Sequence, residues 1–273
     1  MPMEEYSAGL AVVLGRALSA WCEQMAPVSL ERYRQVGGFQ GLARARRMTP
    51  LEALAEVRAS GLRDRGGLAE PVYLHWQRFQ RRHEAGVLVV DATQPDPRSQ
   101  SEAYLLSHNP HGLIEGLLIT AAACGLSRCL LVLPEALLDH QAAIFNAWEE
   151  IQARGLHQGL ELELELVRDA LPSVWSDRPA GGLPEPSLAL RLETWLHLTL
   201  VFSLGAARYR ALGDEDQAGT CLLTLGGPLV RPGLVEAPLG GDLWQVVETL
   251  GGGLAPEAKP LALCLDDGLG GFL

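Results

Sequence analysis

The chain has 273 residues, of which 48% are hydrophobic and 20% are charged, a composition typical of a globular protein that buries a core. Its formal net charge of −11 argues against a nucleic-acid partner, and no apolar run reaches the roughly 20 residues that a transmembrane helix needs. The acidic start, with Glu4 and Glu5, is unlike a secretory signal, so we expect a cytoplasmic protein.

The first part of the chain is predicted to be helical. Residues 7–25 form an apolar helix that Ser7 caps and Pro27 ends. The tetrapeptide Thr49-Pro50-Leu51-Glu52 is a capping box, with Thr as the N-cap, Pro at the first helical position and Glu three residues after the cap. This box predicts a short helix that ends at Gly61.

Apolar strands alternate with helices in the middle of the chain. Strands are predicted over 87–90, 129–133 and 160–167, and helices over 110–124 and 137–154. Strand–helix–strand units with right-handed crossovers form a Rossmann-like parallel sheet, so the fold class is α/β. The third strand alternates Leu with Glu, which exposes one of its faces and is typical of a sheet edge.

The last part of the chain is predicted to consist of smaller elements. In order, these are an irregular connection over 172–186, a helix over 187–204, strands over 221–225 and 234–237, a helix over 242–250 and a strand over 261–265. A strand pair, a helix and a further strand in so short a segment indicate a small α+β module of the β-grasp (ubiquitin-like) type. The predicted division is an N-terminal helical segment over 1–48, a Rossmann-like domain over 49–186, a connecting helix over 187–217 and a β-grasp domain over 218–273.

A Gly-rich stretch from Ser60 to Trp76 joins the capped helix to the first strand. Arg63 and Arg65 stand beside Gly66 and Gly67 in it, and Arg side chains next to free backbone N–H groups suit a phosphate. A solvated loop after a helix C-cap is the alternative.

The same stretch resembles a motif of the NADH-binding flavoprotein subunit of respiratory complex I and of its hydrogenase and formate dehydrogenase relatives, Ser-Gly-Leu-Arg-Gly-Arg-Gly-Gly-Ala-Gly-Phe-Pro-Thr-Gly-Leu-Lys-Trp. Further matches follow in the same order, namely Pro110-His111 with Ile114-Glu115-Gly116, Glu193-Thr194, and a Gly-x-x-x-x-Pro-Gly turn from Gly227 to Gly233. The resemblance implies a fold that binds FMN, oxidises NADH and passes electrons to an iron–sulfur cluster.

The departures from the motif fall on positions that the resemblance assigns to ligands. Ala69 and Glu70 replace the Gly-Phe pair whose ring stacks on the nucleotide, Tyr73 replaces a Gly, and His75 replaces a Lys. A carboxylate cannot stack on a base and repels a phosphate. If Glu70 pairs with Arg63 or Arg65, it also closes the loop.

Two other ligand segments differ as well. The family's loop Asn-Ala-Asp-Glu-Gly-Glu-Pro-Gly-Thr is residues 91–99 here, where Asp96 keeps an acidic role, and the Asn-Asn pair that borders the flavin is Leu190-Arg191. We therefore carry over a vestigial FMN and NADH loop. Its positions are Arg63, Arg65, Gly66, Gly67, His75 and Asp96.

Cofactors, metals and covalent catalysis receive little support from the sequence. The five cysteines form no Cys-x-x-Cys pair, so we expect no iron–sulfur cluster. We expect no bound cofactor, with FMN as the possible exception. His108, His111 and Glu115 are the best candidate metal ligands by spacing, but the resemblance makes this segment a helix start, and Ser173 and Ser176 have no neighbouring base.

Two functions stay open at this stage. The first is a diverged, non-catalytic structural or assembly subunit of a redox complex, bound to a thioredoxin-like ferredoxin subunit or to a catalytic paralogue. The alternative is an FMN-dependent NADH dehydrogenase (electron-transfer) subunit with altered nucleotide contacts. A weaker third reading makes the β-grasp module a sensor of a small ligand.

Overall fold

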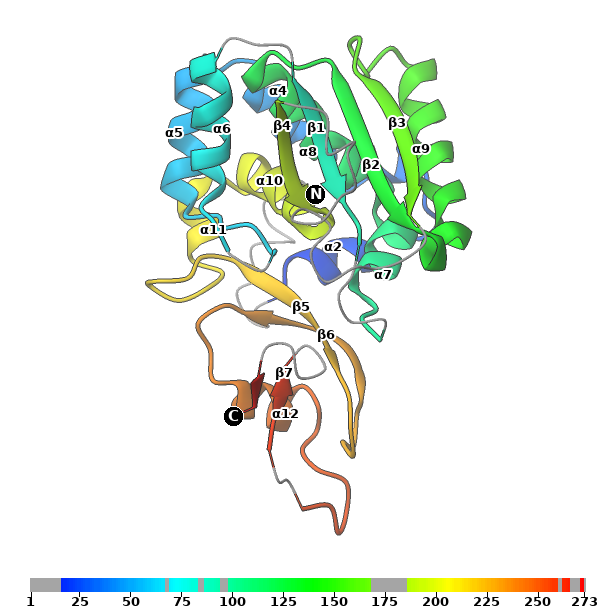
Figure 1. Cartoon of the computed structure of the whole chain (residues 1–273), viewed down its shortest axis with the longest axis vertical. Helices are drawn as coiled ribbons and strands as arrows, with labels where there is room; N and C mark the ends of the chain where they lie inside the picture. Colours follow the sequence, from blue (N-terminus) through cyan, green and yellow to red (C-terminus); the bar gives the residue numbers. More distant parts are fainter. Residues whose placement is uncertain are drawn as a thin grey trace.

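The computed structural model describes residues 16–66, 69–82, 86–93, 98–167, 186–259, 262–265 and 271–272. At its centre lies a parallel sheet of four strands, β1 (Val87–Asp91), β2 (Arg128–Pro134), β3 (Glu161–Val167) and β4 (Ser187–Arg191), in the order β3-β2-β1-β4. The chain runs outward from β1 to β3 and then returns to the other side of β1 as β4 (Figure 1). The predicted α/β class and the edge position of the third strand are confirmed.

Described helices pack against one face of this sheet, whereas the buried residues of the other face, such as Val89 and Val132, form a separate cluster that contains no described helix residue. In the described ranges the helices are α2 (Leu18–Glu23), α3 (Leu30–Gln35), α4 (Gln40–Ala45), α5 (Pro50–Ser60), α6 (Val72–Arg82), α7 (Ser101–His108), α8 (Pro110–Cys124), the 3-10 helix η1 (Glu135–His140), α9 (Gln141–Ala153), α10 (Leu192–Leu204), α11 (Ala206–Arg210) and α12 (Leu243–Thr249). None of the helices in the described ranges is both long and apolar enough to cross a membrane.

Helices α8 and α10 form the centre of the core. Almost every residue of both is buried, as expected of helices that are apolar on all sides. Their backbones lie close together at Gly116, where an added Cβ would stand 2.1 Å from the carbonyl oxygen of Trp195. Thr199 strengthens this contact by donating its hydroxyl to the carbonyl of Gly112 at 2.8 Å.

The C-terminal part of the described chain extends from this body. Strands β5 (Thr220–Leu225) and β6 (Gly233–Pro238) form an antiparallel hairpin, followed by α12 and by the short pair β7 (Cys264–Leu265) and β8 (Gly271–Phe272). Figure 1 shows this part in yellow to red below the sheet, with α2 next to the hairpin. The β-grasp assignment and the division into domains stay predictions.

Several predicted elements are confirmed. The predicted helix over 110–124 is α8 and ends at Gly125, whose φ is 70°. The capping box of Thr49 and Glu52 is present at the start of α5, with both reciprocal hydrogen bonds. The helix predicted over 137–154 begins as η1 and continues as α9.

The predicted helix over 187–204 is wrong in its first five residues. Residues Ser187 to Arg191 are β4, which pairs with β1, and the helix begins at Leu192. A five-residue strand that runs directly into an apolar helix leaves no turn residue to mark the boundary. Helices α6 and α7 were also missed, because the Gly-rich stretch and the loop after β1 carry turn residues. Predicted structure over 7–15, 172–185 and at residue 261 lies outside the described residues.

Candidate functional site

The strand order defines where a ligand site is expected. In an open parallel sheet, ligands bind beyond the carboxyl ends of the strands at the point where the strand order reverses. Here this point lies between β1 and β4, whose last residues, Asp91 and Arg191, are register partners. The segment from Arg63 to Gly66 lies against the same place, since a Cβ on Gly66 would stand 3.1 Å from Cγ of Arg191.

Arg191 occupies the switch point with its own side chain. One guanidinium nitrogen donates to Asp91 at 3.1 Å and to the carbonyl of Thr93, and the other donates to Glu102 of α7 at 2.7 Å. Burial lowers the pKa of Arg191, but the two carboxylates outweigh this effect and raise it. Burial raises the pKa of Glu102. Arg191, Asp91 and Glu102 thus form a cluster of ion pairs within the protein at the switch point.

Asp64 holds the Gly-rich loop on the start of α10. Its carboxylate accepts from the backbone N–H of Arg191 at 3.0 Å and from the hydroxyl of Thr194 at 2.6 Å. Thr194 in turn accepts from the backbone N–H of Arg65 at 2.8 Å. A carboxylate at a helix N-terminus also interacts favourably with the helix dipole. Asp64 stands where the family motif has Gly.

Arg65 points into the protein and not towards the switch point. Its guanidinium donates to the carbonyl of Thr220 at 3.0 Å, to that of Arg63 at 2.9 Å and to the hydroxyl of Tyr209 at 3.1 Å. A weaker contact reaches the carbonyl of Ala218 at 3.4 Å. Since its donors are satisfied by the protein itself, Arg65 is poorly placed to bind a phosphate.

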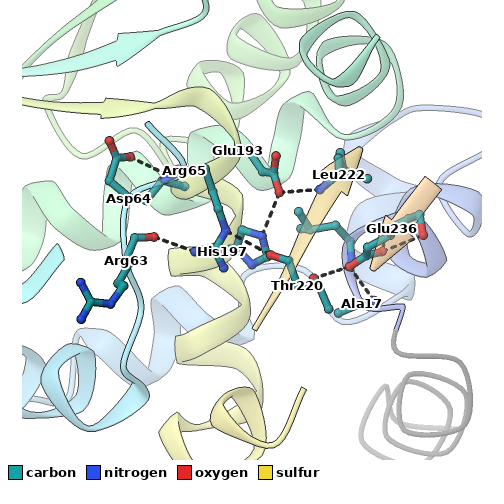
Figure 2. A network of polar contacts seen from close by, with 12 residues as sticks. Ala17, Arg63, Asp64, Arg65, Glu193, His197, Thr220, Leu222 and Glu236 are labelled. Carbon is teal, nitrogen blue, oxygen red and sulfur yellow. Dashed lines mark hydrogen bonds and ion pairs between the residues drawn. The ribbon is translucent and has the colours of Figure 1, made fainter. Parts of the chain in front are cut away.

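A buried polar chain continues from Arg65 to β5 (Figure 2). Tyr209 lies 3.2 Å from Nδ1 of His197, and Nε2 of His197 lies 3.3 Å from Glu193. Glu193 also accepts from the backbone N–H of Leu222 at 3.0 Å. Burial raises the pKa of Glu193 to about 7 and lowers that of His197 well below its usual range. At neutral pH His197 is therefore neutral. This series of buried polar contacts joins α10 and α11 to the hairpin.

Glu236 of β6 anchors the other side of the hairpin. Its carboxylate is buried and accepts from the backbone N–H groups of Ala17, Leu18 and Ser19 at 2.7–3.0 Å. It also accepts from the hydroxyls of Ser19 and Thr220. Glu236 therefore caps α2 and ties it to the hairpin, as Figure 2 shows for its contacts with Ala17 and Thr220.

The remaining predicted loop residues do not converge on one ligand. Arg63 is exposed and donates to the carbonyl of Ala69 at 3.1 Å. The sequence left open whether Glu70 pairs with Arg63 or Arg65, and the structure places it instead 3.2 Å from His75 and 3.5 Å from Arg78. Burial lowers the pKa of His75, which makes it a neutral side chain at pH 7.

Two predicted positions, Gly67 and Asp96, lie outside the described residues. Sequence reasoning missed the partners that make the network. These are Asp64, Glu102, Tyr209, Thr220 and Glu236. The available signal was the joint replacement of two Asn positions by residues of opposite charge, Asp91 and Arg191, at the ends of two strands. Glu236 carried no sequence signal, since its partners at the start of α2 lie more than 200 residues away in the chain.

The candidate metal ligands have other roles. Glu115 accepts from the hydroxyl of Tyr33 at 2.5 Å and from the backbone N–H groups of Phe39 and Leu42. His111 lies 2.9 Å from Glu150, and His108 contacts the carbonyl of Tyr104. No group of His, Cys, Asp and Glu suited to a metal ion occurs among the described residues.

The residues present do not fit FMN in the described part of the crevice. A flavin phosphate needs free donors at the Gly-rich loop, whereas the donors of Arg65 are engaged internally. The cation at the switch point, Arg191, is neutralised by Asp91 and Glu102. Glu70 adds a further negative charge to the loop.

A parallel sheet with a Gly- and Arg-containing loop at its switch point places the chain among proteins with a nucleotide-binding α/β fold. Residues 57–174 match the family model described as the Nuo51 FMN-binding domain of the complex I 51-kDa subunit. The chain is thus a relative of the F subunit of NADH-quinone oxidoreductase and of subunits of NAD(P)-reducing hydrogenases.

Individual relatives support this assignment. The F subunit of NADH-quinone oxidoreductase in Streptomyces coelicolor is 29% identical over 269 residues, which cover 88% of this chain and 60% of that protein. The HndC subunit of the NADP-reducing hydrogenase in Solidesulfovibrio fructosivorans is 28% identical over 87% of this chain and 54% of its own length. A crystal structure of NAD+-reducing [NiFe]-hydrogenase in the air-oxidized state matches with a TM-score of 0.65 at 27% identity, covering 76% of this chain and 39% of that one. The chain thus spans about 60% or less of the length of these relatives.

Proposed function

We propose that this protein is a non-catalytic structural or assembly subunit of a redox complex. The proposal rests on the contrast between a retained frame and replaced ligand contacts. The parallel sheet and the sequence at the start of α8 match the family, whereas the charged side chains around the switch point bind one another.

The observation that carries the proposal is the orientation of Arg65. In the flavoprotein family that the sequence resembles, the loop that matches Arg65 wraps a phosphate. In this structure the guanidinium of Arg65 is instead hydrogen-bonded to Thr220, Tyr209 and Arg63. Releasing it to a phosphate would leave the buried hydroxyl of Tyr209 and the carbonyl of Thr220 short of a donor. An unsatisfied buried polar group costs about 1–3 kcal/mol, so each contact opposes flavin binding.

The relatives support the partner part of the proposal, because their names describe subunits of an NADH-quinone oxidoreductase and of a hydrogenase. A thioredoxin-like ferredoxin subunit or a catalytic paralogue is the partner we propose, in the cytoplasm. No iron–sulfur cluster is part of the proposed role.

The first experiment is a flavin titration of the purified chain. We expect no flavin absorbance in the fresh protein and no quenching of FMN fluorescence on addition of the chain at micromolar concentration. Affinity capture of the tagged chain from its own cells should recover a redox-complex subunit in a defined stoichiometry. Saturable FMN binding would disprove the non-catalytic proposal.

The alternative is an FMN-dependent NADH dehydrogenase (electron-transfer) subunit with altered contacts. The matched FMN-binding family model favours it, as does the left-handed backbone of Ala69, with φ of 45°, a conformation that suits the Gly of the family motif. NADH oxidation with an artificial electron acceptor, in the presence of added FMN, separates the two. Activity that depends on FMN would establish the alternative.

A further inference from the structure

The carboxyl ends of β1 and β4 are filled by side chains of the chain itself. The topology makes this place a ligand crevice, and the side chain of Arg191 lies across it with an exposed fraction of 15%. Its guanidinium binds groups from three places in the fold: Asp91 at the end of β1, Thr93 in the following loop and Glu102 on α7.

The guanidinium of Arg191 is held as a bound ligand would be, and Asp91 and Glu102 form its binding site. A planar guanidinium forms directional bonds with two carboxylates, a geometry that Lys cannot reproduce. Asp91 and Glu102 are themselves buried, with exposed fractions of 3% and 6%. Asp91 is further fixed by the backbone N–H and the hydroxyl of Thr93. The carboxylates therefore form a rigid acidic cradle that is complementary to a flat cation.

The Gly-rich loop closes this cradle from the other side. Gly66 packs on the aliphatic part of Arg191, with its would-be Cβ 3.1 Å from Cγ. Asp64 fixes the same loop by accepting from the backbone N–H of Arg191. Both the side chain and the backbone of Arg191 thus hold the crevice closed.

We propose that Arg191 is a built-in plug that replaces a ligand at the switch point and holds the crevice shut. The plug connects β1, β4, α7 and the Gly-rich loop. The frame therefore keeps its shape without a cofactor. The plug goes beyond the proposed function, because it concerns how the crevice is closed and not what the protein assembles with.

The plug is tested by removing it and supplying its head group from solution. Arg191→Ala removes the guanidinium that pairs with Asp91 and Glu102, and we expect the thermal midpoint to fall by several degrees. Methylguanidinium chloride at low millimolar concentration should restore at least half of this loss, in a saturable manner. Methylammonium chloride at the same ionic strength should not, since its single nitrogen does not reproduce the spacing of the two guanidinium nitrogens that bind Asp91 and Glu102.

The matched control is Arg128→Ala. Arg128 also pairs with a carboxylate, Glu163 at 3.0 Å, but both side chains are about half exposed. We expect a small loss of stability in this variant and no rescue. If Arg191→Ala does not purify folded, the yield of folded chain after dilution from urea is compared with and without methylguanidinium.

Equal rescue of both variants, equal rescue by methylammonium, or no rescue of Arg191→Ala would overturn the plug. These results leave the proposed function untouched, since that is tested by FMN binding to the unchanged chain. Conversely, capture of a partner that is not a redox subunit would remove the proposed function while the plug still stands.

Discussion

Ala69 has a backbone φ of 45°, in the left-handed region that a residue with a Cβ adopts at a cost of roughly 1–2 kcal/mol. The family motif has Gly at this position, and Gly adopts a positive φ without the steric cost of a Cβ. Strain in the backbone of one residue persists only where surrounding interactions hold it. At Ala69 one such interaction is the hydrogen bond that its N–H donates to the carbonyl of Gly66 at 2.9 Å.

Restoring the Gly should relieve this strain. We expect Ala69→Gly to stabilise the chain by about 0.5–1 kcal/mol, because relief of strain exceeds the added entropy of the unfolded chain. Urea denaturation measures the change. The control is Ala55→Gly, at an exposed position within α5, which should destabilise by about 1 kcal/mol. A loss of stability in Ala69→Gly would contradict the expectation.

The ionisation of Glu193, at the junction with the hairpin, makes the stability of the folded protein depend on pH. Its pKa is raised from the ordinary 4.5 to about 7, first by burial. A carboxyl that holds its proton more tightly in the folded state contributes stability that is present below pH 4.5 and is lost as pH rises through 7. His197 acts in the opposite direction, since its lowered pKa contributes stability above pH 6.5 that is lost as pH falls.

Glu193→Gln isolates the carboxyl from the histidine. The variant should gain stability relative to the unchanged chain as pH rises from 5 to 7.5, by on the order of 2–3 kcal/mol. Urea midpoints across this range measure the difference between the two proteins. The control is Glu248→Gln at an exposed position of α12, which lacks the burial of Glu193. A constant difference for Glu193→Gln would mean that Glu193 is ionised throughout.

Among the secondary-structure elements, helices α8 and α10 pack with their backbones in close contact. Gly116 lets the backbone of α10 approach so closely that the carbonyl of Trp195 occupies the place of a side chain. The bond from Thr199 to the carbonyl of Gly112 fixes the same spacing. Core packing of this density leaves no room for an added methyl group.

Gly116→Ala should force the two helices apart. We expect a loss of about 1–3 kcal/mol, the usual cost of overpacking, measured by urea denaturation. Gly226→Ala serves as the control, because Gly226 has no atom within 4 Å of its would-be Cβ and should tolerate the change within about 0.5 kcal/mol. Equal effects of the two substitutions would argue against the close contact.

At the scale of the whole molecule, the parallel-sheet body and the β5–β6 hairpin are joined by buried polar contacts. Arg65 and Glu193 bind β5 from the body, and Glu236 binds α2 from β6. Ala218 and Leu222 also belong to the main hydrophobic core. Groups buried on both sides of a junction favour joint unfolding, since separating them exposes apolar surface and breaks satisfied bonds.

We therefore expect the body and the hairpin to unfold together. Hydrogen exchange of the segments 87–91 and 220–238 in increasing urea should give one midpoint in the unchanged chain. Glu236→Ala leaves the N–H groups of Ala17 to Ser19 without their acceptor, and should lower this midpoint by the equivalent of about 2–4 kcal/mol. The exposed Glu257→Ala should have little effect. Separate midpoints in the unchanged chain would support an independently folding hairpin.

Local sequence patterns predicted much of the frame. The capping box of Thr49, the helix from Pro110 to Gly125 and the buried strand from Val87 depend on short-range rules, and all three are present. The resemblance located the Gly-rich loop and led to the family. The helix predicted over 187–204 contains α10, but its first five residues form β4. This strand was missed because strand pairing is a long-range event.

The sequence by itself determined the α/β class, the order of the central elements and the replacement of several ligand positions, since periodicity, caps and motifs act over a few residues. Only the tertiary structure decided what the replacements do. Arg65 turned inward, Arg191 joined Asp91 and Glu102, and Glu236 capped a helix more than 200 residues earlier. The physical reason is that a buried charge must find its partner in space, and the chain order carries no record of which strand ends and helix starts will meet.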